Sequence, residues 1–77
     1  MMLKYTLIES KDGKIRYKYH PEGGSTFGIV SYSDGKCSIE ILAENDKHER
    51  YALKMFKKLR EMKKNKVFVS DGSLAWY

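Results

Sequence analysis

The sequence predicts a small α+β domain in two layers: an antiparallel meander of four strands, with one amphipathic helix across one face and a short C-terminal β segment. Three observations predict this fold. Apolar and polar residues alternate with period two over the first 42 residues. Asp-Gly pairs, which are typical of tight hairpin turns, divide this part of the chain. Residues 46–66 instead repeat their apolar side chains every three or four positions.

The first two strands are predicted over residues 3–7 and 14–19. Asp12-Gly13 suits the turn between them, because both central residues of such a turn need a positive φ. Lys14, Arg16 and Lys18 alternate onto the face opposite the core. The side chains that alternate onto the core face are Leu3, Tyr5, Leu7, Ile15, Tyr17 and Tyr19.

Two further strands are predicted over residues 27–32 and 37–42, with Asp34-Gly35 as the turn between them. We expect Phe27 and Ile29 to face the helix, which places Val30 and Tyr32 on the opposite face of the sheet. Residues 20–26 contain one proline and two glycines, and they are predicted to form a wide hairpin loop.

The helix is predicted over residues 46–66. Asp46 and Glu49 have the spacing of a capping box, in which each side chain accepts from the other's backbone amide. Asn65 suits the left-handed conformation that ends a helix. The apolar side chains of the helix form a stripe that covers an arc of about 140°, and Leu53 lies outside this stripe. Its members are Tyr51, Ala52, Met55, Phe56, Leu59 and Met62.

The last segment, residues 67–77, is too apolar to remain in water and must dock on its own sheet or on a partner. It forms either a short hairpin or an extended tail that returns to the sheet. The predicted core comprises Leu3, Tyr5, Leu7, Ile15, Tyr17, Phe27, Ile29, Ile39, Ile41, Ala52, Met55, Phe56, Leu59 and Trp76.

Length and composition predict a single domain over residues 1–77, because so short a chain builds only one core. A core of this size buries roughly 60 to 65% of the surface of the unfolded chain. Cys37 has no partner for a disulfide, and one Cys with two His does not supply four zinc ligands. Association with a second subunit is therefore the expected source of additional stability.

The sequence contains no run of 18 apolar residues and no apolar signal-peptide centre near its start. A lone thiol also fits a reducing compartment. We therefore expect a cytoplasmic protein without a membrane partner.

Positive charge is concentrated in residues 46–66, which hold nine of the 15 Lys and Arg and three of the 10 Asp and Glu. This segment has a net charge of +6 and the whole chain +5, so the remainder carries −1. A cationic face of this kind either contacts phosphates or is a solvated face that maintains solubility. The candidate nucleic-acid contacts are Lys47, Arg50, Lys54, Lys57, Lys58 and Lys64.

The first function expected is a non-enzymatic protein-interaction module that forms a homodimer, because one small core cannot use all of the apolar surface. A sheet edge, the second sheet face or the C-terminal tail would provide the contact. Nucleic-acid binding without sequence preference is the alternative function. The candidate interface residues are Ile8, Val30, Tyr32, Leu42, Trp76 and Tyr77.

No catalytic site is predicted. His20 and Glu22 are close in sequence, but a general base needs a positioned partner and a pocket that excludes water. The Gly23-Gly24 pair opens a strand, whereas phosphate-binding glycine loops open a helix. We accordingly expect no cofactor, no metal and no small-molecule substrate.

Several short motifs resemble a group of small uncharacterised proteins from Gram-positive bacteria and their mobile elements. The resemblance runs over nearly the whole chain and implies a complete small bacterial protein. It implies no activity, ligand or catalytic residue. The motifs are Tyr19-His20-Pro21-Glu22-Gly23, Gly28-Ile29-Val30-Ser31, Ser38-Ile39-Glu40, Leu42-Ala43-Glu44-Asn45-Asp46 and Ala75-Trp76-Tyr77.

Overall fold

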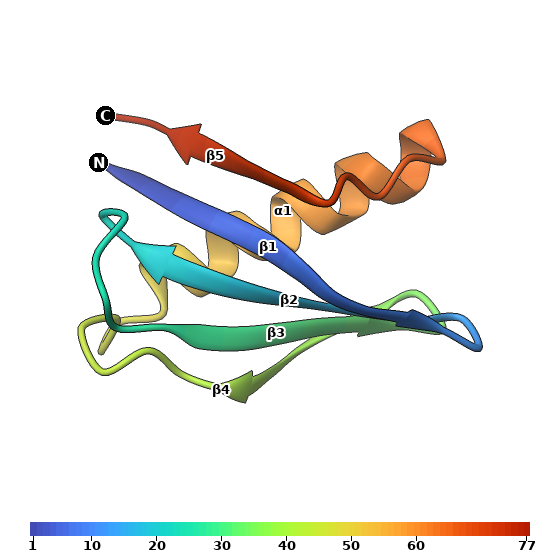
Figure 1. Ribbon diagram of the computed structural model, residues 1–77, viewed down its shortest axis with the longest axis horizontal. Coiled ribbons are helices and arrows are strands. Elements are labelled where there is room, and N and C mark those ends of the chain that lie inside the picture. The colour runs from blue at the N-terminus through green and yellow to red at the C-terminus, as the bar shows by residue number, and fades with distance from the viewer.

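The computed structural model describes residues 1–77 and contains five strands and one helix (Figure 1). All strands belong to one antiparallel sheet with the order β4-β3-β2-β1-β5. The predicted fold class, a four-stranded meander with one helix and a short C-terminal strand, is confirmed. The elements are β1 (Met2–Lys11), β2 (Lys14–Pro21), β3 (Gly28–Ser33), β4 (Lys36–Ile41), α1 (Arg50–Asn65) and β5 (Asp71–Ala75).

The C-terminal segment returns to its own sheet as a single strand. β5 pairs with β1, with Ala75 opposite Met2 and Asp71 opposite Thr6. Figure 1 shows β5 beside β1, at the sheet edge that lies away from β4. The backbone N–H of Trp76 donates to the Met1 carbonyl at 2.8 Å and extends this pairing beyond the strand. The extended alternative was therefore correct and the hairpin alternative was wrong.

Both predicted Asp-Gly hairpin turns are confirmed. Asp12 and Gly13 have φ values of 53° and 79°, and Asp34 and Gly35 have values of 52° and 77°. Positive φ at both central residues matches the right-handed twist of the flanking strands, so these turns direct β1 into β2 and β3 into β4.

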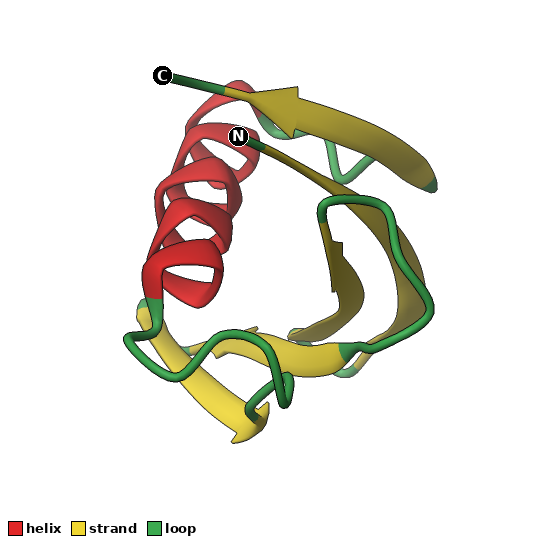
Figure 2. Ribbon diagram, turned by 90° about the vertical axis from the view of Figure 1, so that its left-hand side faces the viewer, coloured by secondary structure: helices red, strands yellow, loops and turns green.

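The two layers meet on the concave side of the sheet. Figure 2 shows the curved sheet with α1 lying against this side. The helix presents its predicted apolar stripe to the sheet, with Phe56 at the half-buried margin of that stripe. The buried core residues are Leu3, Tyr5, Ile15, Tyr17, Tyr19, Val30, Ala43, Tyr51, Ala52, Met55, Leu59 and Met62.

Two glycines make room for buried tyrosine rings. Gly28 lies opposite Tyr19, and Gly72 lies opposite Tyr5. A Cβ atom at position 28 would be 2.4 Å from the Tyr19 ring, and one at position 72 would be 2.5 Å from the Tyr5 hydroxyl oxygen. The absent side chains therefore let both rings pack across the neighbouring strand.

The face of β3 that packs against α1 differs from the prediction. Val30 is fully buried and Tyr32 packs against the core, whereas Phe27 is 39% exposed and Ile29 lies on the outer face. The pairing register explains the difference, since Val30 lies directly opposite the buried Tyr17 and directly opposed residues share a face. In the predicted strand over residues 27–32, one alternating set held Phe27 and Ile29 and the other held Val30 and Tyr32, so the alternation alone did not distinguish the two faces.

The end of β4 also departs from the predicted core. Ile39 lies opposite Val30 and packs against the core, but Ile41 is 47% exposed. The register shifts between these two isoleucines, so that Ile41 lies opposite Ile29 on the outer face. A bulge of this kind adds a residue to one strand and changes which side chains face the core.

The helix begins at Arg50, four residues later than predicted. The predicted capping box is wrong, because the N-cap residue Glu49 makes no side-chain hydrogen bond and has a φ of 58°. Asp46 still supplies acceptors for the start of the helix, from within the preceding turn. Its Oδ1 accepts from the Tyr51 amide at 3.0 Å, and its Oδ2 accepts from the Ala52 amide at 2.9 Å.

The helix ends close to its predicted position, but Lys66 and not Asn65 takes the left-handed conformation, with a φ of 58°. The Lys66 amide donates to the Lys63 carbonyl and the Val67 amide donates to the Met62 carbonyl, which satisfies carbonyls of the last turn. This helix is neither long enough nor apolar enough to cross a membrane.

Candidate functional site

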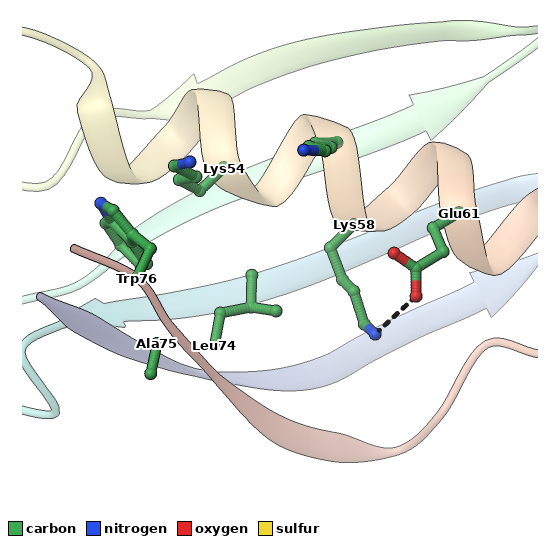
Figure 3. Close-up of a pocket in the computed structure, with 7 residues that line it drawn as sticks. Lys54, Lys58, Glu61, Leu74, Ala75 and Trp76 are labelled. Carbon is green, nitrogen blue, oxygen red and sulfur yellow. Dashed lines mark hydrogen bonds and ion pairs between the residues drawn. The ribbon is translucent and has the colours of Figure 1, made fainter.

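Two adjoining cavities lie along the outward side of α1. The first, of about 250 Å³, lies between α1 and β5 (Figure 3), and the second, of about 520 Å³, lies beside it. Both are lined by Lys54, Lys57 and Trp76. We name the two cavities together the cationic groove. Its lining residues are Met1, Arg50, Leu53, Lys54, Lys57, Lys58, Arg60, Glu61, Leu74, Ala75, Trp76 and Tyr77.

The cationic groove has a strong excess of positive charge. Its side chains include five cations but only one carboxylate, Glu61, which accepts from Lys58 Nζ at 3.1 Å (Figure 3). The other ion pairs of the protein both involve Arg16, on the opposite side of the sheet. Four groove cations therefore have no acidic partner within 4.0 Å: Arg50, Lys54, Lys57 and Arg60.

The helix spaces these cations along one side of the molecule. Arg50, Lys54 and Lys57 lie at intervals of four and three residues, which places them one above another along the helix surface. The distance along the axis from Arg50 to Arg60 is about 15 Å, at a rise of about 1.5 Å per residue. The unpaired charges therefore form a row and not a single point.

The cationic groove also has apolar walls. Leu53, which lies outside the apolar stripe, is 53% exposed and lines the same cavity as Trp76. Trp76 is half-buried, and Lys54 Nζ lies 5.4 Å from the centroid of its ring. Figure 3 shows the indole beside Lys54, with Leu74 farther along β5. An apolar surface and a row of cations therefore share one concavity.

Tyr51 supports Trp76 from the helix. The two rings make an edge contact, with centroids 5.4 Å apart and planes at 66°. The Tyr51 hydroxyl donates to Glu22 Oε2 at 2.5 Å. This hydrogen bond lowers the pKa of Glu22 and raises the pKa of Tyr51, because it favours the carboxylate and the neutral phenol. The aromatic pair is therefore held in place by a charge-assisted hydrogen bond.

The structure brings four of the six predicted nucleic-acid contacts together in the cationic groove. These four are Arg50, Lys54, Lys57 and Lys58. Lys47 lines another cavity with His48, which shares Met1 and Arg50 with the groove, and Lys64 is exposed outside the groove.

Sequence reasoning missed Arg60 and Leu53 as groove residues. Arg60 follows Lys57 by three positions, so helical spacing was a signal that would have found it. The position of Trp76 beside Lys54 had no such signal, because 22 residues separate the two in the chain.

The predicted interface residues, which belong to alternative surfaces, lie in different parts of the molecule. Val30 and Tyr32 face α1, and Trp76 and Tyr77 line the cationic groove. Ile8 is 43% exposed and Leu42 is 39% exposed, each at a different strand. Phe27, next to the start of β3, and Ile41, at the end of β4, are also exposed. Both were predicted to belong to the core.

Arg16, on the outer face of the sheet, is paired with two carboxylates. Arg16 donates to Glu9 and to Glu40, both at 2.9 Å, and its hydrogen bond to Glu40 lowers the pKa of that carboxyl. Ser31 and Ser38 form a hydrogen bond beside them at 2.8 Å. No three side chains of His, Cys, Asp or Glu gather in a group that could hold a metal ion.

Comparisons with protein-family models, with curated proteins and with solved structures find no match for this chain. The resemblance to small bacterial proteins therefore stays a prediction. Any function assigned to the chain has to rest on the geometry and charge of the cationic groove.

Proposed function

We propose that the cationic groove binds nucleic acid through its phosphates, without reading the base sequence. The observation that carries this proposal is the set of four cations without acidic partners around a single tryptophan. Each cation that displaces a counterion from a phosphate strengthens binding and makes it dependent on salt. No Asn or Gln lines the groove, so the side chains that distinguish adenine edges are absent from it.

The alternative predicted from the sequence was a solvated helix face that serves only solubility. Two features of the cationic groove favour ligand binding over that alternative. The cations line two shallow, open depressions together with Trp76, so several of them lie close enough to contact one extended anion. One of these depressions contains Leu53 and Trp76, although exposed apolar side chains contribute nothing to solubility.

The wild-type chain is expected to bind random oligonucleotides at low salt. Four phosphate contacts predict that the logarithm of the binding constant falls against the logarithm of salt concentration with a slope of about −3 for single strands. The double substitution Lys54→Glu with Lys57→Glu is expected to weaken binding about tenfold or more and to flatten the slope to about −1.4, because two contacts are lost. Fluorescence anisotropy of labelled oligonucleotides measures both quantities.

The matched control is Lys11→Glu with Lys36→Glu, which changes the net charge equally at exposed lysines beside the two hairpin turns. This variant is expected to retain most of the affinity. The proposal is contradicted by a wild-type chain that does not bind at low salt, by affinity that is indifferent to salt, or by equal losses in both double variants.

Self-association, the function expected first from the sequence, stays a prediction. Of the residues expected on the second face of the sheet, Val30 is instead fully buried on the face that packs against α1. The exposed apolar residues that remain on the sheet include Phe27, Ile41 and Leu42. Light scattering at high micromolar concentration tests the prediction: a dimer supports it, and a strict monomer contradicts it.

A further inference from the structure

We infer that the cationic groove takes nucleic acid as a single strand and stacks a base on Trp76. This inference rests on the proposed function and adds the form of the ligand to it. The ring lines both cavities, as do Lys54 and Lys57, so a base that contacts it lies near these two cations.

The apolar part of the groove distinguishes a single strand from a duplex. A duplex presents phosphates on its outside and keeps the faces of its bases stacked inside, so cations alone are enough to bind its backbone. A single strand also presents base faces, which stack on aromatic side chains without regard to sequence. Leu53 and Trp76 line one cavity, and they offer base faces the apolar contact that phosphates cannot use.

Trp76 is held as a firm platform for stacking. Its backbone amide donates to the Met1 carbonyl at 2.8 Å, which ties it to the end of β1. Its ring contacts Tyr51, which is fixed in turn by Glu22. Because the indole is only half-buried in these contacts, part of its surface remains open to the groove. A ring that is already ordered loses little conformational entropy when a base packs on it.

The cations lie at the right place to hold the phosphate that is attached to a stacked base. Lys54 Nζ is 5.4 Å from the centroid of the indole ring, and Lys57 lines the same two cavities. An exposed cation–π contact is weak, so Lys54 readily exchanges it for a charge-assisted hydrogen bond to a phosphate. Base and phosphate of one nucleotide are then bound side by side.

The decisive experiment compares oligo-dT with an abasic strand of equal length and with a duplex. The abasic strand keeps the phosphates but has no base to stack. Oligo-dT is expected to bind the full chain about tenfold more tightly than the abasic strand does, since stacking of one base contributes a factor of that order. The chain has a single tryptophan, so its fluorescence reports on this site alone. Oligo-dT is expected to quench that fluorescence, and the abasic strand is not.

Two sets of variants separate stacking from folding. Trp76→Leu is expected to lower the affinity for oligo-dT about tenfold and to leave that for the abasic strand unchanged, while Trp76→Phe retains most of the binding. Because Trp76 also packs on Tyr51, circular dichroism must show that these variants fold. Leu53→Ser, at a site that is 53% exposed, is expected to lower oligo-dT binding without risk to the core.

The outcomes distinguish this inference from the proposed function. Equal affinity for oligo-dT and the abasic strand overturns base stacking and leaves phosphate binding intact. Duplex binding as tight as that of oligo-dT overturns the preference for a single strand. Failure to bind any of the three overturns both proposals. Tighter binding of a glutamate-rich peptide that carries apolar side chains also overturns both, because the groove would then be a peptide site.

Discussion

Replacement of Asp46 by alanine is expected to lower the free energy of unfolding by about 3 kcal/mol. The Asp46 carboxylate is only 2% exposed, and it accepts from the Tyr19 hydroxyl as well as from the Tyr51 and Ala52 amides. Removing it leaves three buried donors without an acceptor, and each unsatisfied group costs about 1 to 3 kcal/mol when it cannot reach water. Urea unfolding followed by tryptophan fluorescence measures the loss.

The expected loss is large beside the whole stability of a domain of this size, which is about 4 to 12 kcal/mol at about 0.05 to 0.15 kcal/mol per residue. Asp46→Asn keeps the shape and one acceptor oxygen, so we expect an intermediate loss. The control is Glu44→Ala, an exposed position nearby, which is expected to change stability by less than about 0.5 kcal/mol. A loss below about 1 kcal/mol for Asp46→Ala would show that the carboxylate is not the main support of the helix start.

The second large effect is expected at alkaline pH. Burial raises the pKa of Tyr17 and that of Tyr19 to about 12, because both rings are fully enclosed and the charged phenolate is poorly solvated there. In the unfolded chain a tyrosine has a pKa of about 10. Folding therefore favours the neutral form of both tyrosines. Their contribution to the free energy of unfolding is fully present below pH 10 and is lost as the pH rises from about 10 through about 12.

Each tyrosine is expected to account for a loss of about 2 to 3 kcal/mol over this range, at about 1.4 kcal/mol per pKa unit. Urea unfolding at a series of pH values measures the decline, and tyrosinate absorbance shows whether unfolding accompanies ionisation. Tyr17→Phe removes one titrating group together with the hydrogen bond to the Val69 carbonyl. It is expected to be less stable at neutral pH but to lose less stability above pH 10. Unchanged stability between pH 10 and 12 would contradict the burial argument.

The buried polar groups connect stability to the candidate site. Asp46 accepts from the Tyr51 amide, and the Tyr51 ring supports Trp76 at the cationic groove. The start of α1 and the aromatic part of the groove therefore depend on the same few hydrogen bonds. For this reason binding should be tested with variants at exposed groove residues such as Leu53 and Lys57, which leave this support in place.

Local signals predicted the elements and their order well. Asp12-Gly13 and Asp34-Gly35 identified two hairpin turns because few residue pairs accept a positive φ at both positions. The spacing of Met55, Leu59 and Met62 identified the buried side of α1, since helical periodicity depends only on positions within the helix.

The predictions were wrong where both faces of a predicted strand carried apolar residues. They were also wrong where a residue from a distant part of the chain made a contact that spacing could not predict. Ile29 and Val30 are both branched and apolar, and only the pairing of β3 with Tyr17 of β2 placed Val30 inside. Asp46 and Glu49 have the spacing of a capping box, but the Tyr19 hydroxyl and the helix amides draw the Asp46 carboxylate into the core. In each case the competing interaction joins residues from different elements.

The amino-acid sequence by itself determined the α+β fold class, the hairpin turns, the buried stripe of the helix and the concentration of positive charge in residues 46–66, because each depends on spacing along a short stretch of chain. Only the tertiary structure decided which face of β3 is buried and that Trp76 lies beside Lys54 and Lys57. Those outcomes depend on the register between strands and on the return of β5 to β1, which bring distant residues together.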